Sequence, residues 1–295
     1  MIRTAAIHGT ALARFVTCMR LHNALAIDLI DDLRPIHTGA DPCGVAFDPH
    51  GDALYVADAY SGAVVRVDGD RQRRIATLAP TGMIGVDRVG AIAITTSGTL
   101  FATQQGSIVR IDRDGRQETV DGLPAGYTRV GLIYEASEHA LYTTQYRASR
   151  HGAQDGSIVM IDLVTGSPST ILDGFAQPIG IAKIGSTLVV ADARQRAVFR
   201  VELSAGRAVY RLQLAADIDR PYALCAYGRD SVLVTTYDEE NQRGAVRRLW
   251  FDGRRKTIAS GPWQPRGIAT DGERGFVAVR RGGRLMTCVI EPSNL

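Results

Sequence analysis

Short runs of aliphatic and β-branched residues alternate along this chain with turns rich in Gly, Asp and Ser. The clearest group reads Pro-Cys-Gly-Val-Ala-Phe-Asp at 42–48, Leu-Tyr-Val-Ala-Asp at 54–58 and Ala-Val-Val-Arg-Val-Asp at 63–68. A more polar run follows at 74–78. Short apolar runs bounded by turn residues are typical of β-strands. The group therefore predicts a meander of four antiparallel strands.

The same group recurs six times along the chain. A small residue anchors the first run of each copy, at Gly44, Gly90, Gly131, Gly180, Ala223 and Gly267, with spacings of 46, 41, 49, 43 and 44 residues. In every copy a Leu or Phe opens the second run 8–10 residues after the anchor. Pairs such as Ser97-Gly98 and Asp114-Gly115 supply the positive φ values of tight hairpins. Repetition of a four-stranded unit at a fixed period predicts an all-β, six-bladed β-propeller.

The two ends of the repeat suggest how the ring closes. The sixth copy ends near Glu291 without a fourth run, and the segment 24–36 precedes the first copy. We expect 24–36 to pair onto the sixth blade as a strand, because this pairing removes an open sheet edge. The expected organisation is a single propeller over 22–295, preceded by an N-terminal arm over 1–21.

Charge and cysteine content exclude several classes of function. The formal net charge of +3 is small, and acidic and basic residues are interspersed, so we expect no nucleic-acid partner. There is no run of 18 apolar residues, and His8 and Arg14 interrupt the N-terminal apolar stretch. We therefore expect neither a membrane partner nor a signal peptide. Four scattered cysteines without a CxxC pair argue against a zinc ribbon and favour a reducing, cytoplasmic location.

The motif Pro-x-Gly-Val-Ala-Phe-Asp…Leu-Tyr-Val-Ala-Asp at 42–58 resembles NHL repeats and the senescence-marker-protein/gluconolactonase class of six-bladed propellers. The resemblance covers about residues 22–291. It implies small-molecule chemistry, as a hydrolase or lyase, in a pocket at the mouth of the central channel. Two other functions stay open: a non-catalytic NHL-type interaction module, and a small-ligand sensor or carrier.

The resemblance also implies a divalent cation on the channel axis, held by Glu, Asn and Asp. The expected Asn falls on Ile179, and a later Asp falls on Tyr222 or Arg266. The usual ligand set is therefore not matched. A divalent cation stays open, with Asp58 and Asp192 as its carboxylate ligands, and no other cofactor is assigned.

Equivalent positions in a propeller lie on one ring, so the residues that end the second run of each copy are expected to converge on one pocket. They are Asp58, Gln104, Gln145, Asp192, Tyr237 and Arg280. Their chemistry differs from blade to blade, which favours function. The alternative is structural, because such an Asp often accepts hydrogen bonds from backbone amides of its own turn. Asp58, Asp192 and Tyr237 are the catalytic candidates.

The remaining candidates are assigned to substrate binding: Gln104, Gln145, Arg280, Arg129, Arg266, Tyr222 and Tyr146. Arginines also occur near the predicted mouth at Arg88 and Arg220. An Arg fork binds carboxylates and phosphates in a bidentate manner. The sequence therefore predicts a small anionic ligand, although in an arginine-rich chain any one of these residues could equally be a surface arginine.

Overall fold

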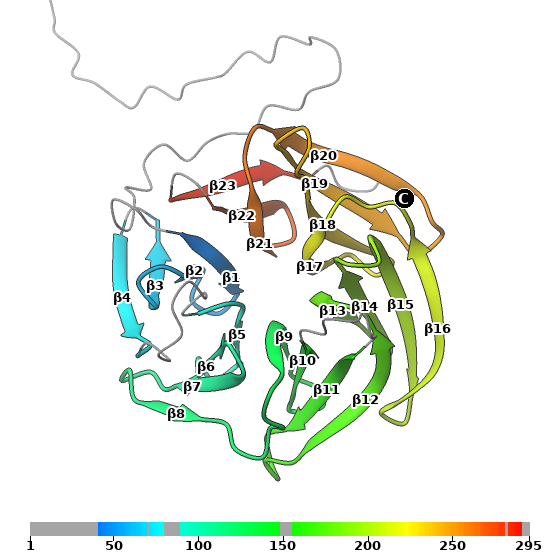
Figure 1. Cartoon of the computed structure of the whole chain (residues 1–295). Coiled ribbons are helices and arrows are strands. Elements are labelled where there is room, and N and C mark those ends of the chain that lie inside the picture. The colour runs from blue at the N-terminus through cyan, green and yellow to red at the C-terminus, as the bar shows by residue number, and fades with distance from the viewer. Residues whose placement is uncertain (1–40, 70, 80–88, 148–154, 281–282, 291–295) are drawn as a thin grey trace, which may run out of the picture.

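The computed structural model describes residues 41–69, 71–79, 89–147, 155–280 and 283–290. The described residues form 23 β-strands in six antiparallel sheets, with no helix among them. The sheets stand around a central axis in chain order (Figure 1). The expected six-bladed β-propeller is confirmed. Across the described ranges no helix is long and apolar enough to cross a membrane.

Each sheet is one blade, and its strands follow each other outward from the axis. Blades I to III comprise β1 (Pro42–Asp48), β2 (Ala53–Asp58), β3 (Ala63–Asp68) and β4 (Arg71–Thr77); β5 (Ile92–Ile94), β6 (Leu100–Gln104), β7 (Ser107–Ile111) and β8 (Gln117–Thr119); β9 (Thr128–Glu135), β10 (Ala140–Tyr146), β11 (Gly156–Asp162) and β12 (Pro168–Phe175). Blades IV to VI comprise β13 (Pro178–Ile184), β14 (Thr187–Asp192), β15 (Ala197–Ser204) and β16 (Arg207–Ala215); β17 (Pro221–Tyr227), β18 (Ser231–Asp238), β19 (Arg243–Trp250) and β20 (Arg255–Gly261); β21 (Pro265–Thr270), β22 (Arg274–Val279) and β23 (Arg284–Val289).

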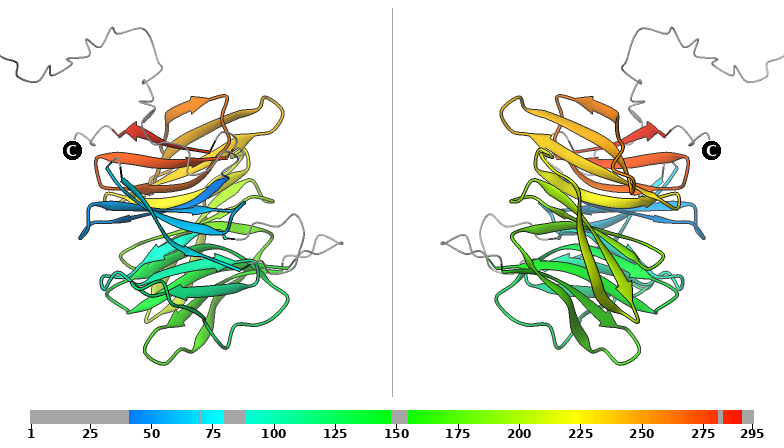
Figure 2. Two further views of the ribbon diagram at one scale, coloured as in Figure 1. Left: turned by 90° about the vertical axis from the view of Figure 1, so that its left-hand side faces the viewer. Right: turned by 90° about the vertical axis from the view of Figure 1, so that its right-hand side faces the viewer.

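The strands run between the two faces of the ring, as the edge-on views show (Figure 2). We call the face where the inner strands begin the mouth face, and the face where they end the far face. The turn after the second strand also lies at the mouth face, because β1 and β2 are antiparallel neighbours and Pro42 pairs with Asp58. The same pairing joins Pro178 to Asp192 in blade IV.

The hydrophobic core is divided among the contacts between blades. Six clusters of buried residues each combine side chains from two neighbouring blades, so every blade-to-blade contact has its own cluster. Tyr142 and Phe175 are among the largest fully buried side chains, and both belong to the cluster between blades III and IV. The ring is therefore stabilised by burial of apolar surface along all of its sheet-to-sheet contacts.

The glycine anchors mark the points where neighbouring inner strands come closest. A Cβ atom on Gly44 would lie 2.2 Å from the carbonyl oxygen of Gly90 in the next blade. A Cβ atom on Gly180 would lie 2.3 Å from the carbonyl oxygen of Tyr222. Real Cβ atoms do not approach backbone oxygens this closely, so only glycine allows the strands to meet at these positions.

The sixth blade has three strands, β21, β22 and β23, in the part of the chain that is described. This agrees with the expected lack of a fourth run at the C-terminal end of the repeat. The segment 24–36, expected to supply the closing strand, lies outside the described residues. Its role in closure stays a prediction.

The first prediction concerns the close approach at Gly180. Gly180→Ala is expected to lower the free energy of unfolding by about 2–3 kcal/mol, because the added methyl group forces the β13 and β17 backbones apart. The matched control is Ala223→Gly at the equivalent position of blade V, expected to cost no more than about 1 kcal/mol. Urea denaturation measures both. Equal, small effects would show that the contact is not rigid.

The second prediction concerns closure. Removal of residues 1–37 is expected to abolish the cooperative thermal transition, because it takes away the strand proposed to cover the edge of β23. Removal of 1–18 is expected to leave the melting temperature unchanged. Circular dichroism on the two truncated proteins makes the comparison, and identical melting of both would contradict closure by 24–36.

Candidate functional site

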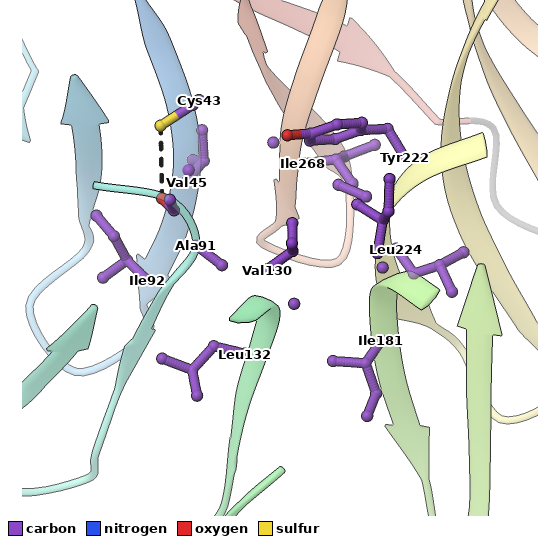
Figure 3. Close-up of a pocket in the computed structure, with 17 residues that line it drawn as sticks. Cys43, Val45, Ala91, Ile92, Val130, Leu132, Ile181, Tyr222, Leu224 and Ile268 are labelled. Atoms are coloured by element: carbon purple, nitrogen blue, oxygen red, sulfur yellow. Dashed lines mark hydrogen bonds between the residues drawn. The ribbon is translucent and has the colours of Figure 1, made fainter. Parts of the chain in front are cut away.

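The mouth-side half of the central channel contains a cavity of about 70 Å³ lined by all six inner strands. Its walls are mostly aliphatic, as Figure 3 shows. The apolar side chains are Val45, Ala91, Ile92, Val130, Leu132, Ile179, Ile181, Ala223, Leu224 and Ile268. The polar side chains of the described lining belong to Cys43 and Tyr222. The side chains that line the channel are therefore mostly apolar, and the five lining glycines, Gly44, Gly90, Gly131, Gly180 and Gly267, present backbone groups to it.

Backbone carbonyls at the start of the inner strands are capped by the preceding blade. The four bonds run from Cys43 Sγ to Val89 O at 3.0 Å, Thr103 Oγ1 to Val130 O at 3.3 Å, Thr144 Oγ1 to Ile179 O at 2.9 Å and Thr235 Oγ1 to Arg266 O at 2.9 Å. These bonds tie neighbouring blades together. The capped carbonyl oxygens therefore have less capacity to accept hydrogen bonds from a ligand in the channel.

Tyr222 and Arg266 form a stacked pair at the mouth. The Arg266 guanidinium carbon lies 4.5 Å from the centre of the Tyr222 ring, within the range of a cation–π contact. Both side chains are half-buried. The Tyr222 ring extends over the channel and its hydroxyl points toward the axis (Figure 3). Within the described ranges the Arg266 guanidinium has no hydrogen bond or ion pair, so its N–H edge can receive an anion.

The other arginines expected at the mouth have partners. Arg280 Nε lies 3.0 Å from Asp41 Oδ2, and Arg220 forms an ion pair with Glu239. Arg129 is buried and donates to the carbonyl oxygens of Gly106 and of Pro124, the latter at 2.8 Å. Burial lowers the pKa of the Arg129 guanidinium. Arg88 lies outside the described residues.

The carboxylates of Asp58 and Asp192 are fully buried and hydrogen-bonded within their own blades. Asp192 accepts from the backbone amides of Ala176 at 2.7 Å, Gln177 at 3.1 Å, Arg194 at 3.1 Å and Gln195 at 3.0 Å. Asp58 accepts from Asp41 N at 2.8 Å, Tyr60 N at 3.1 Å and Ser61 Oγ at 2.6 Å. Each carboxylate thus joins the segment leading into its blade to the turn after the second strand. This geometry supports the structural alternative for both residues.

The two strand-end glutamines do not line the channel cavity and are hydrogen-bonded elsewhere. Gln104 Nε2 donates to Ala79 O at 2.6 Å. Gln145 is buried, and its Nε2 donates to Ser157 Oγ at 3.1 Å.

Tyr237 is buried, and its hydroxyl donates to Gln242 Oε1 at 2.8 Å. It lines a separate cavity of about 510 Å³ whose other lining residues come from the mouth-face turns of blades IV and V. Gln177 Nε2 donates to the hydroxyl of Tyr146 at 3.2 Å, which holds Tyr146 against the segment that leads into blade IV. Of the predicted site residues, the structure places Tyr222 in the channel lining, with Arg266 stacked upon it. The six strand-end side chains do not line that cavity.

The described residues do not fit a divalent cation on the channel axis. A hard cation takes several oxygen ligands at about 2.0–2.6 Å. No group of three His, Cys, Asp or Glu side chains suited to a metal is found where the structure is described. Ile179 presents an aliphatic side chain to the cavity, and the carboxylates of Asp58 and Asp192 are occupied by N–H and O–H donors.

No family model matches the chain, and no curated protein matches it. Solved structures do. A luciferin-regenerating enzyme superposes with a TM-score of 0.70 and 11% identity, covering 90% of this chain and 95% of its own. A gluconolactonase from Xanthomonas campestris superposes with a TM-score of 0.70 and 16% identity, covering 86% of this chain and 87% of its own. The calcium-binding protein regucalcin from Agrobacterium tumefaciens superposes with a TM-score of 0.68 and 16% identity, covering 90% of this chain and 94% of its own. The chain therefore has the fold of the gluconolactonase and regucalcin six-bladed propellers.

The third prediction separates structural from catalytic roles for the buried aspartates. Asp192→Ala is expected to lower the free energy of unfolding by about 2–4 kcal/mol, because several buried amides lose their acceptor. The exposed Asp173, two strands away in chain order, provides the control: Asp173→Ala should stay within about 0.5 kcal/mol. Thermal and urea denaturation measure both. Unchanged stability of Asp192→Ala would contradict the structural role.

Proposed function

We propose that the protein is a small-molecule enzyme of the lactonase-like propeller class, a hydrolase or lyase that binds an anionic metabolite at the mouth of the channel. The observation that carries this proposal is the stacked pair of Arg266 and Tyr222 above an apolar cavity. Likeness to a gluconolactonase and a luciferin-regenerating enzyme supports the class of chemistry.

Arg266 would hold the anionic group of the ligand. Stacking on Tyr222 fixes the plane of the guanidinium, so less rotational freedom is lost when its N–H groups bind a carboxylate or phosphate. The aliphatic walls beneath the pair exclude water, and a charge-assisted hydrogen bond is stronger where water is excluded. Arg280 and Arg220 already have carboxylate partners, which leaves Arg266 as the anion-binding residue of the proposal.

Tyr222 would act on the reacting atoms. Its hydroxyl is directed toward the channel axis (Figure 3), and a positioned phenol can donate or accept a proton in hydrolysis or elimination. We derive no step that passes through a metal, because the described side chains do not provide a fitting set of ligands.

A small-ligand binding protein is the second candidate. The observation that favours it is the absence of a carboxylate or imidazole from the described lining of the channel cavity. Such a protein would bind the ligand with Arg266 and the cavity without catalysing a reaction of it. In either case the four cysteines are scattered along the chain without a CxxC pair, which supports a reducing compartment such as the cytoplasm as part of the proposal.

The fourth prediction tests the pair directly. Arg266→Ala is expected to weaken binding of small carboxylates about 10- to 100-fold, since a charge-assisted hydrogen bond contributes about 1.5–3 kcal/mol. Tyr222→Phe is expected to keep binding and to lose turnover of a panel of lactones and esters. Isothermal titration and an ester-hydrolysis assay, each repeated with a chelator that should change nothing, provide the measurements.

Arg207, which is exposed at the β15–β16 hairpin on the far face of the ring, provides the matched control. Arg207→Ala should leave binding and melting temperature unchanged. Carboxylate binding that survives Arg266→Ala would contradict the proposed site. Arg266-dependent binding without turnover of any panel member would select the binding protein over the enzyme.

A further inference from the structure

The channel below Arg266 and Tyr222 has the surface of an apolar tail pocket. Val130 of blade III and Ile179 of blade IV line it, and Leu132 and Ile181 reach it from the buried contacts between blades. Four carbonyl oxygens at the start of the inner strands accept hydrogen bonds from Cys43, Thr103, Thr144 and Thr235, which reduces the acceptor positions open to a ligand. A polar ligand group that enters this space meets mostly aliphatic side chains, which cannot replace its hydrogen bonds to water.

That loss is large enough to select the ligand. Each hydroxyl buried without a partner weakens binding by about 5- to 150-fold. Each methylene group buried against aliphatic walls strengthens binding by about fourfold. A polyhydroxylated sugar acid is therefore disfavoured in the channel, and a carboxylate that bears an aliphatic group is favoured.

The pocket also has a defined depth. Five aliphatic residues line both the mouth-side cavity and a second cavity of about 320 Å³ that opens on the far face: Val45, Ile92, Leu132, Leu224 and Ile268. They mark the level where the two cavities meet. The far cavity is polar, because Lys183 lines it and its Nζ lies 3.2 Å from Glu135 Oε2. An aliphatic tail therefore gains apolar contacts down to this level. Methylene groups that extend beyond it enter the polar far cavity and add no further affinity.

We propose that the ligand of this site is an amphipathic carboxylate, with its anionic group on Arg266 and an aliphatic tail seated in the mouth-side channel. This inference rests on the proposed function, because it assigns a substrate class to the same site. It explains why an arginine stacks on Tyr222 of the channel lining while most other lining side chains are aliphatic.

The test is a series of straight-chain carboxylates from acetate to octanoate, titrated calorimetrically against the full-length protein, with gluconate as the polar comparison. Affinity is expected to rise about fourfold per methylene and then to level off. Gluconate is expected to bind no better than acetate. Ile179→Asn, which places an amide in the wall, is expected to reduce the preference for octanoate over acetate about 5- to 10-fold.

Two further variants keep the test decisive. Val209→Asn makes a related apolar-to-Asn change at an exposed position of β16 and should leave the preference intact. Val130→Thr adds a hydroxyl to the wall with little change of volume and serves if Ile179→Asn lowers stability. It should reduce the preference in the same direction.

The outcomes separate this inference from the proposed function. Equal affinities for acetate, octanoate and gluconate, all lost in Arg266→Ala, would leave the anion site standing and overturn the tail pocket. Chain-length dependence that is unaffected by Ile179→Asn and Val130→Thr would place the tail elsewhere and overturn it as well. Binding that Arg266→Ala does not weaken would overturn both.

Discussion

The close approach of neighbouring inner strands at the glycine anchors is the constraint on which the rest of this structure depends. At Gly44 and Gly180 the backbone of one blade meets a carbonyl oxygen of the next, at a separation where a Cβ atom would lie only 2.2 or 2.3 Å from that oxygen. These contacts bring the inner strands close together around the axis. The channel is narrow as a result, and the glycine backbones and the residues that follow them line it.

The same close packing explains why most polar groups near the mouth make hydrogen bonds that stabilise the fold. Where strands meet, their polar atoms must find partners, because an unpaired buried group costs about 1–3 kcal/mol. The hydroxyl groups of Thr144 and Thr235 bridge to carbonyl oxygens of the next blade. The Asp192 carboxylate accepts hydrogen bonds from backbone amides of the two segments that flank it. Arg266 differs from these groups, since its guanidinium stacks on Tyr222 without an acidic partner among the described residues.

The blades could be predicted from the sequence because they depend on local patterns that repeat. Six anchors with regular spacing define six meanders, and the position of each inner strand follows from its glycine. The candidate site was less predictable, because strand ends place side chains by contacts that are not local in sequence. Asp192 and Gln145 occupy equivalent positions, yet each turns toward partners in its own blade, such as Ser157 for Gln145. Sequence also could not separate Arg280, which pairs with Asp41, from Arg266, which does not. The apolar wall did leave a signal: Ile179 stands where the resemblance leads one to expect a metal-binding Asn.

The central claim is that the mouth-side channel holds a ligand whose anionic end lies on Arg266. A crystal structure of the protein soaked with ω-bromohexanoate tests it most directly, because anomalous scattering locates the bromine independently of the rest of the density. The account predicts a bromine peak in the mouth-side channel beside Val130 and Ile179, with the carboxylate against Arg266. A bromine peak in the cavity beside Tyr237, or density for the carboxylate away from Arg266, would contradict it.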